Sequence, residues 1–231
     1  TQLPSRSAII AVLSRPFGLF VADRTVQHNG GMPRDGGATR DLLLDVAERL
    51  VERNGFAATS VEMILSEAGS SKGAFFHHFS SKRALAHALV ERYVAADLGT
   101  LAAGLEAASG ESDPVAKLLA FLDYFVGRAS ALTSESACLY IAVLVEQDLL
   151  DDVTSAHVER AIIGWREAVA ALMREAFAAM PWDRPRPEPE DLADQLFVVI
   201  EGAFLMCRAA GSPEPMRAQL LVYRQLVAAL L

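Results

Sequence analysis

Two short helical patterns separated by a glycine constrain the fold of this chain more than any other feature. The segment TSVEMILSEAG (59–69) opens with a capping-box pattern, in which the Thr59 hydroxyl accepts from the Glu62 amide while the Glu62 side chain reaches back. Apolar residues follow at helical spacing as far as Gly69, which tolerates the left-handed conformation past a helix end. The segment SSKGAFFHHFSSKRAL (70–85) begins the next helix after a tight turn. Two such helices behind a supporting first helix are typical of a helix-turn-helix.

The side chains of the second short helix divide into two faces. Phe75 and Phe79 are four residues apart, so they share one face and can pin this helix to the helix before it. Lys72, Phe76 and His77 then face outward, and in a helix that reads DNA the outward side enters the major groove. An exposed Phe at position 76 suits contact with a sugar or a thymine methyl group.

Local charge supports this interpretation, although the whole chain is acidic. The chain carries 21 Lys and Arg against 29 Asp and Glu, a net charge of −8, which argues against a protein that coats nucleic acid indiscriminately. Between Gly69 and Leu85, however, Lys72, Lys82 and Arg83 occur with no acidic residue. The expected helix N-termini add backbone N–H groups that bind phosphate. An ordinary solvated surface has a similar charge pattern, so charge alone leaves both interpretations open.

Metal and catalytic sites are not expected. The neighbouring His77 and His78 diverge by about 100° on a helix and cannot readily hold one ion. No nucleophile elbow, metal-ligand spacing or phosphate loop occurs, so the sequence predicts neither an enzyme nor a cofactor. Cys138 and Cys207 lie in apolar helical patterns, which favours reduced, buried thiols over a disulfide.

The first residues differ from the rest of the chain. The apolar run AIIAVLSRPFGLFV (8–21) is too short to span a bilayer and is interrupted at Arg15-Pro16. It lacks a good cleavage site, which disfavours a signal peptide. The glycine-rich stretch HNGGMPRDGG (28–37) follows, and we expect the functional chain to begin near Met32. Residues 1–37 are therefore predicted to be a leader or a disordered arm.

From Thr39 onward the pattern is helical throughout, and no stretch keeps the period of two that a strand requires. Asn54-Gly55 ends the first helix, and the proline-rich segment 181–190 ends the longest one. Helices are expected near 39–53, 61–68, 72–79, 81–105, 114–126, 137–145, 152–180, 190–210 and 213–230. The sequence thus predicts an all-α protein with a three-helix helix-turn-helix domain over 38–84 and a helical bundle over 85–231.

The stretch ATSVEMILSEAGSSKGAFFHHFSSKRAL (58–85) resembles the DNA-binding segment of the TetR/AcrR family of bacterial transcriptional regulators. The resemblance is specific over residues 39–95, and beyond them only length and helical layout are similar. It implies about nine helices, dimerisation through the last two, and a cytoplasmic repressor that leaves its palindromic operator when a small molecule binds. A family-like module that has lost DNA binding is the alternative, which Lys72 and Lys82 argue against.

The resemblance also assigns candidate DNA-binding residues. Thr59 and Ser60 match phosphate contacts at the second helix, and Lys82 matches a lysine that anchors the next helix to the DNA backbone. Phe76 stands where a Tyr commonly bonds phosphate, so that hydrogen bond is excluded here. The full set is Arg40, Thr59, Ser60, Ser71, Lys72, Gly73, Ala74, Phe76, His77 and Lys82.

Two further sets of residues are predicted for the bundle. Aromatic and polar side chains of the middle helices could line a pocket for a hydrophobic effector, although each is more readily explained as plain core. The last two helices could form an antiparallel four-helix dimer interface, or could simply complete a monomeric core. The effector candidates are Phe121, Tyr124, Phe125, Cys138, Tyr140, His157 and Trp165, and the interface candidates are Leu192, Leu196, Val199, Ala203, Cys207, Leu220, Tyr223 and Val227. The expected partners are double-stranded operator DNA, an unidentified effector and a second copy of the chain, with no membrane.

Overall fold

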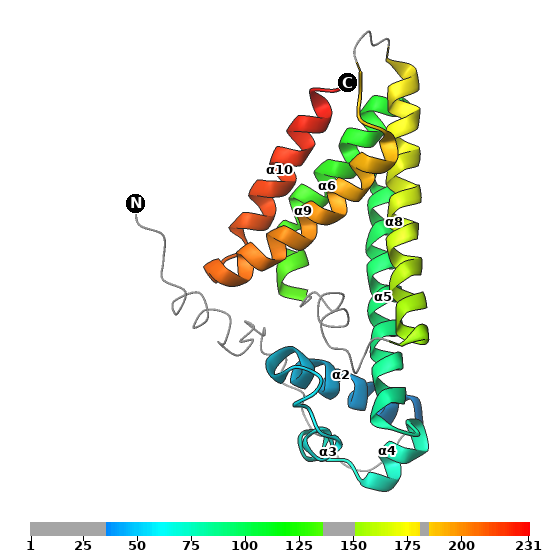
Figure 1. Ribbon diagram of the computed structural model, residues 1–231, viewed down its shortest axis with the longest axis vertical. Helices are drawn as coiled ribbons and strands as arrows, with labels where there is room; N and C mark the ends of the chain where they lie inside the picture. Colours follow the sequence, from blue (N-terminus) through cyan, green and yellow to red (C-terminus); the bar gives the residue numbers. More distant parts are fainter. Residues whose placement is uncertain (1–35, 136–150, 181–184) are drawn as a thin grey trace. The chain divides into compact units, whose positions relative to one another are not determined.

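The computed structural model describes residues 36–135, 151–180 and 185–231, and every regular secondary-structure element within them is a helix (Figure 1). The prediction of an all-α fold is confirmed. The helix expected over 137–145 and residues 1–35 of the arm expected over 1–37 lie outside the described residues, while residues 36 and 37 begin α2 and not the arm. The helices are α2 (Gly36–Asn54), α3 (Val61–Ala68), α4 (Lys72–His78), α5 (Lys82–Ala107), α6 (Pro114–Glu135), α8 (Asp152–Ala179), α9 (Pro189–Ala210) and α10 (Glu214–Ala228).

The described helices belong to two compact units. The N-terminal unit contains α2, α3, α4 and α5 as far as Val90, together with the first residues of α8 up to Thr154. The C-terminal unit contains the rest of α5 and α8 with α6, α9 and α10. Since α5 and α8 each run from one unit into the other, these two helices are the described elements that both units share.

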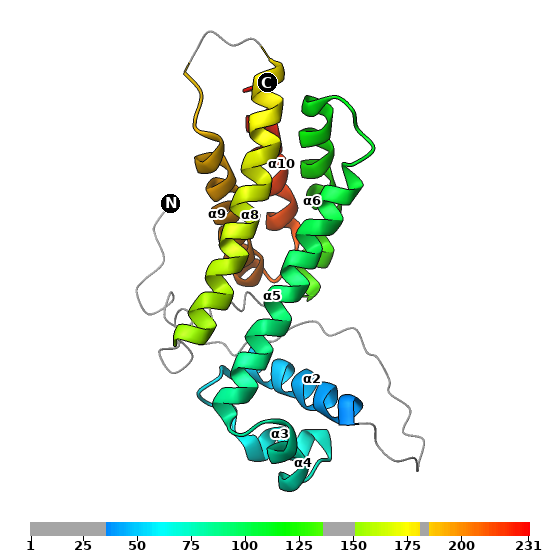
Figure 2. The same ribbon diagram turned by 90° about the vertical axis from the view of Figure 1, so that its right-hand side faces the viewer.

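The N-terminal unit is built on α2, which packs against both α3 and α4 (Figure 2). Apolar side chains of these three helices form its core. Gly69 ends α3 in the left-handed conformation (φ 57°), as predicted, and this turns the chain toward α4. The buried side chains of this core include Leu43, Val46, Ala47, Leu50, Ile64, Phe75 and Phe79.

The start of α3 corrects the capping-box prediction by one residue. Ser60 is the N-cap, and its hydroxyl oxygen accepts from the backbone N–H of Met63 at 3.1 Å. Thr59 is fully buried, and its hydroxyl instead donates to the carbonyl of Gly55 at 2.8 Å. Gly55 turns the chain at the end of α2 with a φ of 82°. The bond from the Thr59 hydroxyl to the Gly55 carbonyl therefore stabilises this turn.

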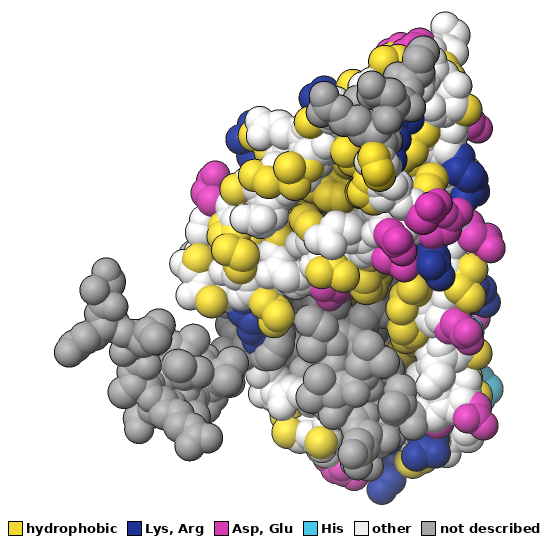
Figure 3. Space-filling view, turned by 45° about the horizontal axis from the view of Figure 1, so that its top comes forward, with side chains coloured by type: hydrophobic (Ala, Val, Ile, Leu, Met, Phe, Trp, Pro, Cys, Tyr) yellow, Lys and Arg dark blue, Asp and Glu magenta, His cyan; other side chains and the backbone are white. Residues whose placement is uncertain are grey.

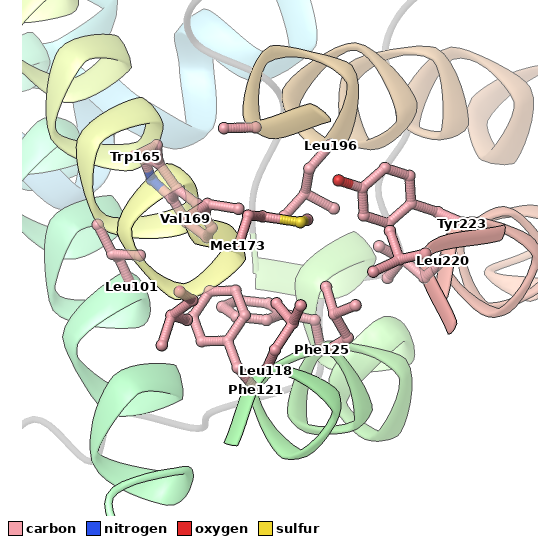
Figure 4. Close-up of a cluster of buried hydrophobic side chains, with 14 of the residues drawn as sticks. Leu101, Leu118, Phe121, Phe125, Trp165, Val169, Met173, Leu196, Leu220 and Tyr223 are labelled. Atoms are coloured by element: carbon pink, nitrogen blue, oxygen red, sulfur yellow. The ribbon is translucent and has the colours of Figure 1, made fainter. Parts of the chain in front are cut away.

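The C-terminal unit has an aromatic and aliphatic core in which α10 packs against both α6 and α9. Figure 4 shows side chains of α6, α8 and α9 converging on this core, and the rings of Phe121 and Phe125 lie 5.0 Å apart. Tyr223 of α10 reaches across to α9, where its hydroxyl donates to the Leu192 carbonyl at 2.5 Å. Arg224 donates twice to the Asp123 carboxylate, at 2.9 and 3.0 Å, which fixes α10 against α6.

Candidate nucleic-acid interface

The short helix α4 is held by its cap and by two phenyl rings. Ser71 is its N-cap, and the hydroxyl oxygen accepts from Ala74 N at 3.1 Å. Phe75 has no exposed surface and Phe79 only 3%, and their ring centroids lie 5.6 Å apart. The guanidinium of Arg40, from α2, lies 5.4 Å from the centre of the Phe79 ring. The prediction that Phe75 and Phe79 share one buried face is therefore confirmed, and α4 packs against α2, whereas the prediction named the helix directly before it.

The opposite side of α4 is open to solvent. Phe76 is 47% exposed and touches the Phe75 ring edge-on at 5.3 Å, so its outer face is left uncovered. Lys72, Gly73 and His77 are exposed beside it. This surface offers a cation, an imidazole, a flat apolar ring and a backbone with no side chain at position 73. Such a set can contact both phosphates and base edges.

Two predicted phosphate contacts have intramolecular partners in the structure. The Thr59 hydroxyl and backbone N–H both donate to carbonyls of its own turn, at 2.8 and 3.2 Å, so neither is presented to a ligand. The expectation that Thr59 contacts phosphate is corrected on this ground. The Nζ of Lys82 donates to the carbonyls of Phe56, at 2.6 Å, and Ala57, at 3.4 Å.

The N-terminal unit contains a polar cluster that the sequence did not predict. Asp151 caps α8 by accepting at Oδ1 from the backbone N–H groups of Val153 and Thr154, at 3.1 and 2.9 Å. Its Oδ2 accepts from Nε2 of His87 on α5, at 2.7 Å, with Arg83 at 3.9 Å. The backbone bond from Thr154 and the bond from His87 lower the pKa of Asp151 to about 2.

This cluster joins α5 to the beginning of α8 within the N-terminal unit. Asp151 and His87 are 64 residues apart, so no spacing rule could have paired them. The local pattern of Asp151 followed by Thr154 does predict a cap, but it does not identify the partner on α5.

The residues predicted for an effector pocket differ in their burial and contacts. Phe121 and Phe125 are buried in the core of the C-terminal unit, and Trp165 is buried beside them with its ring 5.3 Å from that of Phe125. The indole N–H of Trp165 donates to the Asp97 carboxylate at 2.8 Å. Tyr124 is partly buried against the same core. These contacts suit the plain-core alternative as well as a pocket.

The remaining effector candidates add little. His157 is half-buried, and its Nδ1 accepts from the guanidinium of Arg160 at 3.0 Å. Cys138 and Tyr140 lie outside the described residues.

The predicted dimer-interface residues mostly lie inside the chain's own core. Six of the eight are buried there, because one face of α9 and one face of α10 pack against each other and α10 also packs on α6. Leu192 and Val199 are partly buried against the same core. The six buried side chains are therefore not available as an external surface. The six buried residues are Leu196, Ala203, Cys207, Leu220, Tyr223 and Val227.

A different apolar face of α9 and α10 is exposed, and we call it the outer face. On α9, positions 198, 202, 205 and 206 follow helical spacing, and on α10 positions 222 and 226 do so. Figure 3 shows hydrophobic side chains gathered on the surface of this unit. The large side chains of the outer face are Val198 (60% exposed), Leu205 (56%), Met206 (49%), Val222 (46%) and Leu226 (63%).

Other kinds of site are not formed by the described part of the chain. Within residues 36–135, 151–180 and 185–231, no three His, Cys, Asp or Glu side chains come together as metal ligands do. None of the described helices is both long enough and apolar enough to cross a membrane. Cys207 is a buried thiol whose sulfur accepts from Met216 N at 3.2 Å, and burial raises the pKa of this thiol.

A capped α3, a left-handed glycine turn and a clamped α4 with an open outer side define a helix-turn-helix DNA-binding protein. Comparison with known proteins agrees. The model of the bacterial regulatory proteins of the tetR family matches residues 43–89, and the tetracyclin repressor-like C-terminal domain matches residues 114–221. The chain belongs to the TetR family, and it is a DNA-binding transcriptional regulator, not an enzyme.

Named relatives and solved structures extend over most of the chain. The HTH-type transcriptional repressor NemR of Escherichia coli is 29% identical over 82% of this chain and 94% of its own length. The transcriptional regulator AcuR of Cereibacter sphaeroides is 27% identical over 81% and 84%. The crystal structure of reduced E. coli NemR is 25% identical, covers 80% of this chain and 95% of its own, and has a TM-score of 0.62. A TetR regulator from Chloroflexus aurantiacus is 26% identical, covers 84% and 96%, and has a TM-score of 0.68.

Proposed function

We propose that this protein is a ligand-responsive repressor that binds a palindromic operator as a homodimer and leaves it when a small hydrophobic effector binds. The observation that carries the proposal is the open side of α4, where Lys72, Phe76 and His77 are exposed while Phe75 and Phe79 hold the helix from behind. The name of the E. coli relative, a transcriptional repressor, supports repression as the direction of control. Such a protein acts in the cytoplasm, where its operator is.

Sequence preference is assigned to the exposed side of α4. Lys72 can donate to guanine or phosphate, His77 can donate to or accept from a base edge, and Phe76 can pack on a thymine methyl group. Ser60 and Ser71 are at helix N-termini, where neighbouring N–H groups favour phosphate. Arg40, Gly73 and Ala74 complete the proposed contact surface.

Dimerisation is assigned to the outer face of α9 and α10. Five large apolar side chains exposed on two adjacent helices form the kind of patch that a monomer rarely leaves in water. Two copies related by a two-fold axis would bury both patches in one four-helix interface. That symmetry presents two α4 helices to the DNA, so the operator is expected to be palindromic, with half-sites about 34–36 Å apart.

Effector binding is assigned to the C-terminal unit. The coupling between effector binding and operator binding is assigned to α5 and α8. A hydrophobic compound would bind among the aromatic side chains around Phe121, Phe125 and Trp165 and favour one packing of α5 and α8. Because α5 begins at Lys82, directly after α4, a change in its tilt would alter how α4 is presented to DNA. The effector would then weaken operator binding by its differential affinity for the two arrangements.

A footprint on the DNA upstream of the protein's own gene tests the proposal. We expect protection of two half-sites related by symmetry, with affinity that falls steeply as salt is raised. Lys72→Ala and His77→Ala should each change sequence preference, while Lys117→Ala removes a cation on α6 and should change nothing. Uniform weakening by both α4 variants would remove them as base-reading residues. No binding at low salt would overturn the proposed function.

A further inference from the structure

The first turn of α8 is closed by two residues that cap each other. Asp151 Oδ1 accepts from the backbone N–H of Thr154 at 2.9 Å, and the Thr154 hydroxyl oxygen accepts from the backbone N–H of Asp151 at 3.0 Å. The Thr154 side chain is fully buried, so this cap is shielded from water. Because one carboxylate oxygen completes the cap, the other oxygen, Oδ2, is left for a partner on another helix.

His87 of α5 is that partner, with its Nε2 2.7 Å from Oδ2. The pKa of Asp151 is about 2, so the carboxylate only accepts at neutral pH and Nε2 donates. The other residues of the segment 85–90 are apolar and buried, so His87 belongs to a well-packed part of α5. Arg83 lies 3.9 Å from the same oxygen, but 63% of its side chain is exposed and it adds little.

A second polar bond joins α5 to α8 further along both helices, within the C-terminal unit. The indole N–H of Trp165 donates to the Asp97 carboxylate at 2.8 Å. The two helices approach closely there, since a Cβ at Gly164 would lie 3.0 Å from a methyl carbon of Leu98. Helix α8 is continuous from Asp152 to Ala179, so a shift of its first turn is carried along the backbone toward Trp165.

We propose that His87 and Asp151 are positioning residues for the allosteric response, and that their bond sets the packing of α8 against α5 in the arrangement that binds the operator. The inference rests on the proposed function and names residues for the coupling that it assigns to α5 and α8. A cap alone needs one acceptor, which Ser or Thr would supply, whereas the second carboxylate oxygen serves α5. Because coupling between sites is reciprocal, operator binding at α4 also changes the packing around Trp165.

The first measurement uses the full chain without DNA or effector. The chain contains two Trp residues, so Trp182→Phe leaves Trp165 as the source of tryptophan emission, and acrylamide quenching then reports how tightly its ring is packed. Asp151→Ser keeps a capping hydroxyl but is too short to reach His87. It should lower Tm by about 2–4 °C and raise the quenching constant of Trp165 about twofold, because α8 opens locally more often.

Variants at position 87 separate positioning from loss of packing. His87→Gln keeps an N–H donor near the place of Nε2 and should retain the original quenching, while His87→Leu has no donor and should behave as Asp151→Ser does. The double variant should be no worse than either single one, because both substitutions remove the same bond. Asp123→Ser is the matched control: it breaks the bond from Arg224 that joins α10 to α6, and should leave the quenching of Trp165 unchanged.

Operator affinity is then measured by gel shift on the footprinted duplex. Asp151→Ser and His87→Leu should each weaken binding by about 5–20-fold with the same salt dependence, because neither removes a phosphate contact. His87→Gln should bind as the unaltered protein does. Should Asp151→Ser fail to fold, His87→Leu and His87→Gln make the same comparison.

Three results would overturn the inference: unchanged quenching of Trp165 when the bond is removed, unchanged operator affinity in both variants that lack it, or no rescue by His87→Gln. Failure of the unaltered protein to bind DNA would count against the proposed function. The quenching comparison is made without DNA, so it would still decide whether the bond between His87 and Asp151 sets the packing of α8.

Discussion

The helix-turn-helix of the N-terminal unit and the α9–α10 pair of the C-terminal unit leave different side chains uncovered. On α4, a lysine, a histidine and one phenyl ring are exposed around a buried phenyl clamp. On α9 and α10, five large aliphatic or thioether side chains are exposed on the outer face. The first surface suits a polyanion and the second suits another apolar surface. The two proposed binding surfaces therefore differ in kind: one consists of a few polar positions on a short helix, and the other is a broader apolar face.

The largest expected effect is at the phenyl clamp. Phe75→Ala should lower the free energy of unfolding of the N-terminal unit by about 3–5 kcal/mol, because the ring has no exposed surface and leaves a cavity. Operator binding should be lost with it. Phe76→Ala, one residue along, should change stability by less than about 0.5 kcal/mol while weakening operator binding. Denaturant unfolding with gel-shift assays measures both. Equal destabilisation by the two variants would contradict the division of α4 into two faces.

The next effect concerns the outer face. Leu226→Glu places a charge where 63% of the side chain is exposed, so the protomer should fold normally. A dimer interface at this position should weaken by about 2 kcal/mol or more, roughly thirtyfold in dissociation constant. Sedimentation analysis over a range of concentrations measures it. Ile163→Glu is the matched control, since Ile163 is 44% exposed and belongs to α8, which contributes no residue to the outer face. If Ile163→Glu breaks the dimer and Leu226→Glu does not, the dimer interface lies on α8 and not on the outer face.

Two glycines of α5 test how tightly the C-terminal core is packed. A Cβ at Gly104 would lie 2.6 Å from a ring carbon of Phe125, whereas a Cβ at Gly99 would meet nothing within 4 Å. Gly104→Ala should therefore destabilise the protein by about 1–2 kcal/mol despite its better helix propensity. Gly99→Ala should stabilise it by about 0.5–1 kcal/mol. Thermal unfolding of both variants provides the comparison. Stabilisation by both substitutions would mean that the Phe125 ring shifts readily to accept the added methyl group at position 104.

The smallest effect is expected at Asp151. Its folded-state pKa of about 2 lies below the ordinary value of 3.8, so its contribution is complete above about pH 4 and disappears as the pH falls toward 2. Asp151→Asn keeps a capping side chain but loses the carboxylate that faces His87, and it should cost about 1 kcal/mol at neutral pH. Denaturant unfolding between pH 5 and pH 2 should show a shallower acid loss in the variant. Asp152→Asn, at the exposed next position, is the control and should retain the wild-type pH profile.

Sequence reasoning succeeded where a residue's role depends on its near neighbours. Gly69 ends α3 and the Phe75–Phe79 pair clamps α4, and both follow from spacing alone. The capping residue was misplaced by one position because Thr59 and Ser60 are both good caps, and only the fold shows which of them is buried. The carbonyl partners of Lys82 could not be derived locally, since they lie 25 and 26 residues earlier.

The bundle was predicted less well for a physical reason. Both α9 and α10 are apolar on two faces, and the sequence does not say which face the protomer keeps for itself. Leu220 and Tyr223 belong to the stripe that α10 buries, while Val222 and Leu226 belong to the stripe that it exposes. Choosing between them requires knowing where α6 packs. Two stripes of similar hydropathy become distinguishable only after the partner helix is in place.

The carboxylate of Asp151 has a practical consequence for dissecting this molecule. The N-terminal unit is discontinuous in sequence, because residues up to Thr154 belong to it along with those that end at Val90. A proteolytic or recombinant fragment that stops at residue 90 would keep the imidazole of His87 but discard the group that it bonds to. Such a fragment would be a poor substitute for the intact protein in spectroscopic work on DNA recognition, even though every helix of the motif is present in it.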